Sequence, residues 1–206
     1  MAFEELKRGT QDLHRRLEQA VDIESACSDL RTYRDLLSRL LGYYEPMEDE
    51  LSRVSWDLAG LDFAARRKTA WLHHDLAFLG ITQAEQAELP RCSELPRPGS
   101  MAAALGAMYV LEGATLGGQI IVRLINKSLG LAPPLGAGFY AGYGLHNGSM
   151  WLSFKAVTLR HLESRASIEE AVHTARETFT TYEAWLRVAA EPSHRTLDSH
   201  REIQRA

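Results

Sequence analysis

Apolar residues recur along most of the chain with the spacing of an α-helix. Near the N-terminus, a narrow arc of one helix face collects Leu6, Leu13, Leu17 and Ala20. The segment 33–54 predicts a second helix, which Pro46 kinks or breaks. The segment 62–80 predicts a third helix, and Gly80 suits its C-terminal end. The first part of the chain is therefore expected to be helical throughout.

The same pattern continues through the second half. Thr82 and Glu85 have capping-box spacing for a short helix, and a proline-rich loop separates it from a long apolar helix over about 100–128. The segment 130–149 holds six glycines in 20 residues and is expected to be a long loop.

Two serines mark the last predicted helices. Ser149 is expected to cap a helix that carries Lys155, and Ser167 with Glu170 has capping-box spacing for a long final helix. The polar tail from about residue 191 is expected to be poorly ordered. Without a repeat or linker, the pattern predicts a single all-α domain over 1–206.

Composition narrows the functional classes. The formal charge of −4 and the lack of a basic stripe argue against nucleic acid as the main partner. The charged N-terminus is unlike a signal peptide, and the longest apolar stretch, Met101 to Leu111, is well short of the ~20 residues that span a bilayer. The only cysteines, Cys27 and Cys92, form no metal or disulfide pattern. We therefore expect a cytoplasmic protein without membrane insertion.

The long apolar helix contains glycines at its centre. Gly113, Gly117 and Gly118 each cost roughly 1 kcal/mol relative to alanine in a helix interior. Gly106, Gly113 and Gly117 form one bare stripe, whereas Gly118 lies off it and suggests a local bend. The stripe fits either close packing of two helices or a helix laid flat against a planar ligand. Glu112 within the run indicates polar surroundings.

Of the eight histidines, His14 has the most suggestive neighbours. It lies at the edge of the apolar stripe of the first helix, and Glu18 follows one turn later, where its carboxylate can approach the imidazole. A metal-bound histidine typically donates its other ring N–H to such a partner. Lys7 lies on almost the same face, roughly 10 Å away at 1.5 Å rise per residue. A metal-centred, flat ligand with an anionic edge suits this arrangement, although a semi-buried histidine beside a glutamate also occurs as a structural pair.

His73 and His74 are a weaker candidate. Adjacent helical residues point about 100° apart, so these two side chains cannot bind one ion from a regular helix. We expect a solvated helix edge there.

Two sequence stretches together resemble the signature helices of the haem oxygenase family. The first is "LKRGTQDLH", followed by Glu18, and the second is "YVLEGATLGGQ", about 100 residues later. The likeness covers most of the chain and includes its length, its helical pattern and the order of its elements. It implies a helical fold that holds haem between a proximal and a distal helix.

The resemblance also implies roles for individual residues. His14 would be the axial ligand of the haem iron, with Glu18 as its hydrogen-bonding partner. Gly113 and Gly117 would belong to the distal helix, where the bare backbone leaves room for dioxygen. Lys7 matches a lysine that contacts the haem propionates.

Further positions follow with a looser alignment. Lys155 falls near a basic position of similar role, and Phe179 and Tyr182 on the last helix would line the pocket. Ala114 departs from animal members, which carry aspartate at that position, so other polar groups or the backbone would have to hold the distal water.

The implied reaction is oxidative cleavage of haem, which is both substrate and cofactor, to biliverdin, carbon monoxide and ferrous iron. It uses O2 and electrons from an external ferredoxin or reductase. Two alternatives stay open at this point: a non-catalytic haem protein for storage or delivery, and a helical interaction domain without haem.

Overall fold

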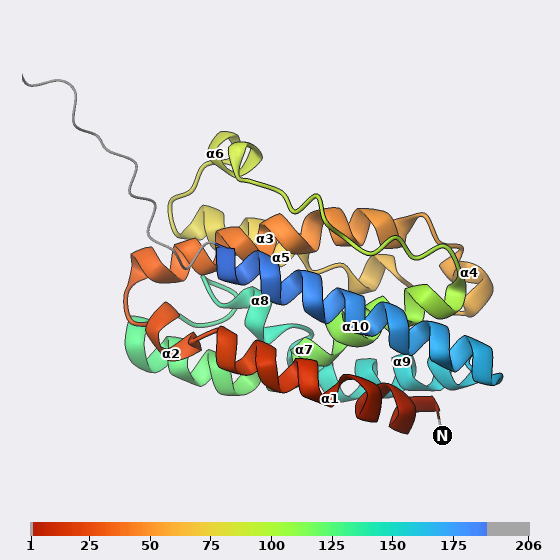
Figure 1. Cartoon of the computed structure of the whole chain (residues 1–206). Helices are drawn as coiled ribbons and strands as arrows, with labels where there is room; N and C mark the ends of the chain where they lie inside the picture. The colour runs from red at the N-terminus through yellow and green to blue at the C-terminus, as the bar shows by residue number, and fades with distance from the viewer. Residues whose placement is uncertain (1, 189–206) are drawn as a thin grey trace, which may run out of the picture.

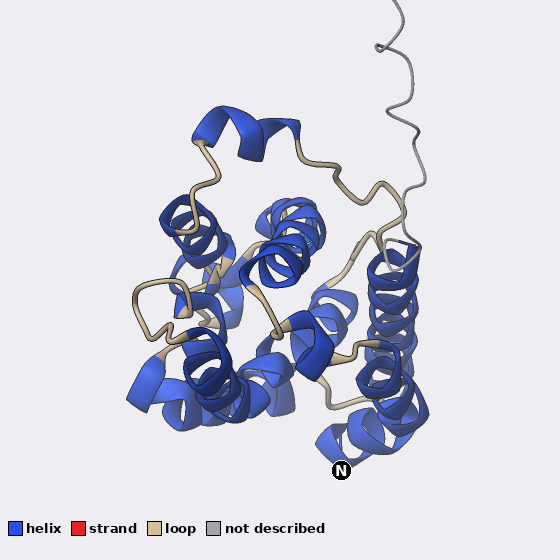
Figure 2. Ribbon diagram, turned by 90° about the vertical axis from the view of Figure 1, so that its left-hand side faces the viewer, coloured by secondary structure: helices blue, strands red, loops and turns tan. Residues whose placement is uncertain are grey.

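A computed structural model describes residues 2–188, and these form helices and loops without a β-strand (Figures 1 and 2). The polar tail expected from about residue 191 lies outside the described residues. The all-α prediction is confirmed. In chain order the helices are α1 Ala2–Ala20, α2 Ile23–Ala26, α3 Leu30–Ser52, α4 Trp56–Ala59, η1 Ala64–Arg66, α5 Thr69–Phe78, α6 Gln83–Glu88, α7 Met101–Leu129, α8 Gly138–Ala141, η2 Gly144–His146, α9 Asn147–His161 and α10 Arg165–Val188.

The long glycine-bearing helix is α7, within one residue of its predicted bounds. The Ser100 side chain accepts a hydrogen bond from the Ala103 amide, and Gly130 ends the helix with a left-handed φ of 69°. The helix stays continuous through its glycines.

Three boundaries in the first half differ from or refine the prediction. Pro46 was predicted to kink or break its helix, and it lies inside α3, so the helix does not break there. The predicted helix over 62–80 is divided into η1 and α5, because the buried Glu48 carboxylate accepts hydrogen bonds from the backbone amides of Lys68 and Thr69. The predicted end is confirmed, since Gly80 follows α5 with a φ of +89°.

Boundaries in the second half differ too. The segment 130–149 is not a plain loop, since it holds α8 and η2 and begins α9. Helix α9 starts at Asn147, and the Ser149 hydroxyl donates to the His146 carbonyl instead of capping. At α10, Ser164 performs the capping predicted for Ser167, because its hydroxyl oxygen accepts from the Ser167 amide.

Helix α10 supports the two helices that carry the candidate site. A Cβ added to Gly106 of α7 would lie 2.1 Å from the Ala171 carbonyl oxygen, and one added to Gly9 of α1 would lie 2.6 Å from Val172 Cγ1. Consecutive residues of α10 thus meet α7 and α1. The contact of Gly106 with backbone requires glycine, and that of Gly9 leaves no room for a Cβ unless Val172 moves. The buried apolar residues around these contacts form one core cluster.

A polar contact fixes α1 against α10. Arg176 donates to the Gly9 carbonyl and binds both carboxylate oxygens of Asp12, at 2.8 and 3.0 Å. The hydrogen bonds from Arg176 lower the pKa of Asp12 below its usual value. The pair is exposed, so it orients α1 more than it stabilises the fold.

Among the described residues, α7 is the one helix long and apolar enough to cross a membrane. Half of its most apolar window is buried inside the protein, as in the core helix of a soluble protein, so length and composition are weak evidence for a span.

Candidate functional site

The contacts with α10 bring His14 and Gly113 to the same level of the molecule. In Figure 1, α1 and α7 run in the same direction. His14 lies five residues beyond Gly9, about 7.5 Å along α1, and Gly113 lies seven residues beyond Gly106, about 10.5 Å along α7. The two signature stretches, about 100 residues apart in sequence, therefore lie at one level of the fold.

His14 is held from two sides and leaves one ring nitrogen free. Its Nδ1 lies 3.4 Å from a Glu18 carboxylate oxygen, and its ring meets the Phe179 ring edge-on at 5.8 Å between centroids. The imidazole is 57% exposed. Because Nδ1 faces Glu18, Nε2 is the nitrogen available to a ligand.

The glycines of α7 divide into two functional pairs. A Cβ on Gly117 would meet no atom within 4 Å, and one on Gly113 would meet only Trp151, at 4.0 Å. A Cβ on Gly118, in contrast, would lie 2.0 Å from the Tyr140 carbonyl oxygen. Gly106 and Gly118 therefore serve helix packing, whereas no protein atom packs against Gly117. Within the predicted stripe, Gly106 therefore fits the packing alternative, whereas Gly113 and Gly117 have the open backbone that a planar ligand needs. Gly118 marks a close approach to Tyr140.

The face of α7 around the open glycines is apolar and uncovered. Ile120 shares the angular position of Gly113 and Gly117 and is 73% exposed, while neighbouring Leu116 is 49% exposed. Apolar side chains beside bare backbone form a flat surface that suits a planar apolar ligand. With an available imidazole nitrogen at the same level on α1, these residues fit haem.

The two predicted basic residues flank the same end of α1. Lys155 places its ammonium 5.4 Å from the centre of the Phe3 ring, and Lys7 follows Phe3 by one helical turn and is exposed. Lys155 and Lys7 can therefore reach a common anionic group at this end of the site.

An aromatic cluster at that end was missed from sequence. Tyr109 lies one turn before Gly113, and its ring contacts Phe3 at 5.7 Å and Trp151 at 5.9 Å between centroids. Burial raises the pKa of Tyr109, so its hydroxyl stays protonated and can donate a hydrogen bond. The spacing Tyr109–Gly113 was the available signal, because residues four apart share a helix face.

The remaining predicted residues lie in different surroundings. Tyr182 is buried against Tyr43 and Tyr44 of α3, with ring centroids 4.6 and 6.0 Å away, so these ring contacts place it in the core and not at His14. Ala114 is exposed on α7.

His73 and His74 lie at a helix edge that is partly exposed, as predicted, but His73 also has polar partners. Its Nδ1 lies 2.6 Å from Gln86 Oε1 and its Nε2 lies 3.0 Å from Glu45 Oε1, so it links α5 to α6 and α3. Among residues 2–188, no group of three histidine, cysteine or carboxylate side chains is placed to bind a metal ion. A single-histidine ligand such as His14 is compatible with that result, because a haem iron needs only one from the protein on the proximal side.

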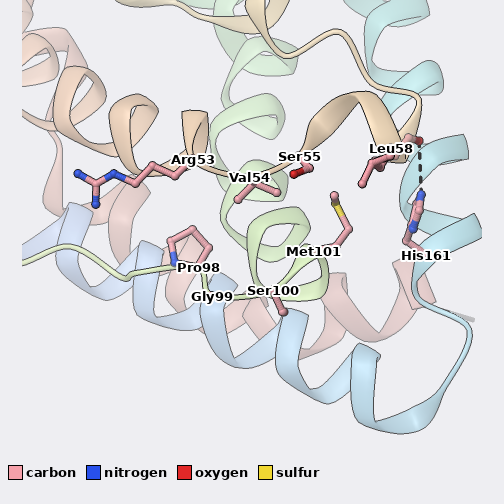
Figure 3. A pocket seen from close by; sticks show the side chains of 10 residues that line it. Arg53, Val54, Ser55, Leu58, Pro98, Gly99, Ser100, Met101 and His161 are labelled. Carbon is pink, nitrogen blue, oxygen red and sulfur yellow. Dashed lines mark hydrogen bonds between the residues drawn. The ribbon is translucent and has the colours of Figure 1, made fainter.

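A surface hollow lies away from these residues. It has a volume of about 440 Å³ and is bordered by Arg53, Leu58, Met101 and His161, with His161 Nε2 3.4 Å from the Ala59 carbonyl oxygen (Figure 3). None of the predicted site residues lines it, so we assign it no part in the site.

Comparison with known proteins identifies the family of the chain and supports its fold. A family model described as heme oxygenase matches residues 1–188. A heme oxygenase of Xanthomonas campestris is 32% identical over 165 residues, which cover 80% of this chain and 94% of that protein. The solved heme oxygenase of Neisseria meningitidis, bound to NO and CO, has a TM-score of 0.77 at 20% identity and 92% coverage of both chains. That of Leptospira interrogans has a TM-score of 0.72 at 18% identity, covering 89% of this chain and 97% of that one. These two structures support the fold.

Proposed function

The chain belongs to the haem oxygenase family, and from this premise we propose that haem binds between α1 and α7, with His14 as its axial ligand. The enzyme cleaves haem to biliverdin, carbon monoxide and ferrous iron, using O2 and electrons from a reductase or ferredoxin. Haem is at once the substrate and the group that activates O2.

In this proposal, helix α1 binds and orients the haem. His14 would supply Nε2 to the iron, while Glu18 accepts the Nδ1 proton and keeps the imidazole in the tautomer that can ligate. The edge-on Phe179 ring restricts rotation of the imidazole. With one histidine ligand from the protein, the opposite face of the haem would remain open to O2.

In this proposal, helix α7 leaves space for O2 on the haem face opposite His14. Without Cβ atoms at Gly113 and Gly117, the helix backbone can lie close to the ring and still admit a small molecule beside it. Exposed Leu116 and Ile120 would be covered by the ring and would exclude water from it.

The observation that carries the proposal is the pair of uncovered glycines level with an available histidine nitrogen. The test is haem titration of the purified protein, followed by addition of a reductant system under air. We expect a histidine-ligated haem spectrum and then a biliverdin spectrum. A stable haem complex that forms no bilin would instead indicate a storage or delivery protein.

Glu18→Gln is expected to retain haem but to alter its spectrum and slow turnover. Loss of such a hydrogen-bonding partner of a metal ligand typically costs about 10–100-fold in affinity or activity. The matched control is Glu177→Gln on α10, which removes a carboxylate at the same spacing from another exposed histidine, His173, at 3.3 Å. If both variants change only folding stability, and by the same amount, Glu18 has no role in haem binding.

Lys7→Ala and Lys155→Ala are expected to weaken haem binding or to change the mixture of biliverdin isomers. The two ammonium groups would pair with the propionates, and without them the ring can rotate about the iron–histidine bond. Isomer analysis of the products measures this, with Lys127→Ala in the last turn of α7 as the control for loss of a lysine. Wild-type binding and isomers in both site variants would mean that other residues bind the propionates.

We further propose a cytoplasmic location. Both cysteines, Cys27 and Cys92, are free and buried, which is compatible with a reducing compartment.

A further inference from the structure

One buried carboxylate lies at the centre of α7, directly before the open glycines. Glu112 Oε2 accepts a hydrogen bond from Arg66 Nη1 at 2.5 Å. Its Oε1 accepts from Lys68 Nζ at 2.5 Å and from the Tyr143 hydroxyl at 2.7 Å. Arg66, Lys68 and Glu112 are all nearly inaccessible to solvent, so this contact is a fully desolvated ion network.

The partners of Glu112 are themselves fixed to other elements. Arg66 donates from both Nη1 and Nη2 to the Met150 carbonyl at 3.2 Å, and from Nη2 to the Ser153 hydroxyl at 3.3 Å. Lys68 also donates to the Arg66 carbonyl, at 2.9 Å. The carboxylate thereby connects α7 to η1, to the start of α5 and to α9.

This network lies beside a face of α7 on which no side chain of the helix packs against a neighbour in the described part of the chain. Gly113 and Gly117 have no side chain by which neighbours can fix the helix, whereas Gly118 is held by its close approach to Tyr140. The bare stretch therefore lies between two fixed points, Glu112 before it and Gly118 after it. Since successive residues differ by about 100° around the axis, fixing Glu112 fixes the direction in which Gly113 faces.

We propose that Glu112, held by Arg66 and Lys68, is a positioning residue that sets the rotation of α7, so that Gly113 and Gly117 face the haem ring. The inference rests on the proposed function of these glycines. Stability alone does not account for a buried ion network, because apolar residues of similar volume often stabilise a core as well or better. The directional hydrogen bonds of the network fix the rotation of α7 about its own axis more sharply than apolar packing would.

The first test is hydrogen–deuterium exchange of the haem-free protein. Glu112→Gln presents N–H groups to Lys68 or Arg66 in place of an acceptor. We expect exchange over 113–120 to rise by about tenfold to a hundredfold, since an unsatisfied buried group has a cost of that order. Glu183→Gln is the matched control: this buried carboxylate pairs with Arg16 at 3.2 Å and Arg187 at 2.9 Å, on α1 and α10. Tyr143→Phe removes one hydrogen bond to Glu112 and leaves the Glu112 carboxylate charged. It is the variant to measure if Glu112→Gln does not fold.

The second test is the product. With a displaced glycine face, Glu112→Gln and Tyr143→Phe are expected to change the ratio of biliverdin isomers and kcat, with smaller changes in KM, while Glu183→Gln retains wild-type products. Wild-type exchange over 113–120, or the same increase in Glu183→Gln, would overturn the proposal. Faster exchange with unaltered isomers and kcat would also overturn it, because Glu112 would then stabilise α7 without orienting it. If the wild-type protein forms no bilin, the proposed function fails, and the exchange experiment still decides whether Glu112 anchors α7.

Discussion

His14→Ala will abolish haem turnover while leaving the haem-free fold intact. The side chain is more than half exposed and lies at the edge of the α1 stripe, so its removal creates no cavity in the core. The variant retains the apolar face of α7 and can still hold haem by packing, but it offers no nitrogen at the position of Nε2. We expect a changed haem absorption spectrum, no biliverdin, and partial recovery of both when imidazole is added.

His173→Ala on α10 is the control, because His173 has the same i, i+4 relation to a glutamate and is also exposed. It should retain the wild-type spectrum and turnover. An unchanged spectrum and full biliverdin output in His14→Ala would contradict the assignment of the ligand.

The sequence predicted this candidate site because its residues occur at helical spacing on two helices. The relation of His14 to Glu18 depends only on the pitch of α1, and the mutual position of Gly113 and Gly117 depends only on that of α7. Residue spacing within each helix therefore predicted the α1 and α7 parts of the candidate site, and the family resemblance implied that the two helices face one another across the haem.

What the sequence did not predict depends on contacts between distant segments. A helical wheel cannot show that Gly106 meets the Ala171 carbonyl while Gly117 meets nothing. Glu112 suggested only polar surroundings, because its partners Arg66, Lys68 and Tyr143 come from segments 31 to 46 residues away. A tertiary contact also decided the start of α5, where the Glu48 carboxylate takes over amides that a longer helix would have used.

The two kinds of glycine in α7 predict opposite results for the same substitution. Gly106→Ala and Gly118→Ala place a methyl group 2.1 and 2.0 Å from the carbonyl oxygens of Ala171 and Tyr140. Backbone atoms cannot move aside as a flexible side chain can, so we expect a loss of at least about 1–3 kcal/mol from overpacking. For a chain of this size, each 1 kcal/mol lowers Tm by about 2–4 °C.

Gly113→Ala and Gly117→Ala should behave in the reverse way. Their methyl groups meet no backbone, and alanine is favoured in a helix interior by roughly 1 kcal/mol, so the haem-free proteins should melt at or above the wild-type temperature. Turnover should fall, because the methyl group occupies the space between the helix backbone and the haem face where O2 must enter. Thermal melts of the haem-free proteins beside single-turnover measurements separate the two pairs. If Gly113→Ala and Gly117→Ala instead destabilise the haem-free protein and leave turnover intact, these glycines serve helix packing. A glycine that is needed only for the substrate can be replaced without loss of folding stability, and its replacement slows the reaction.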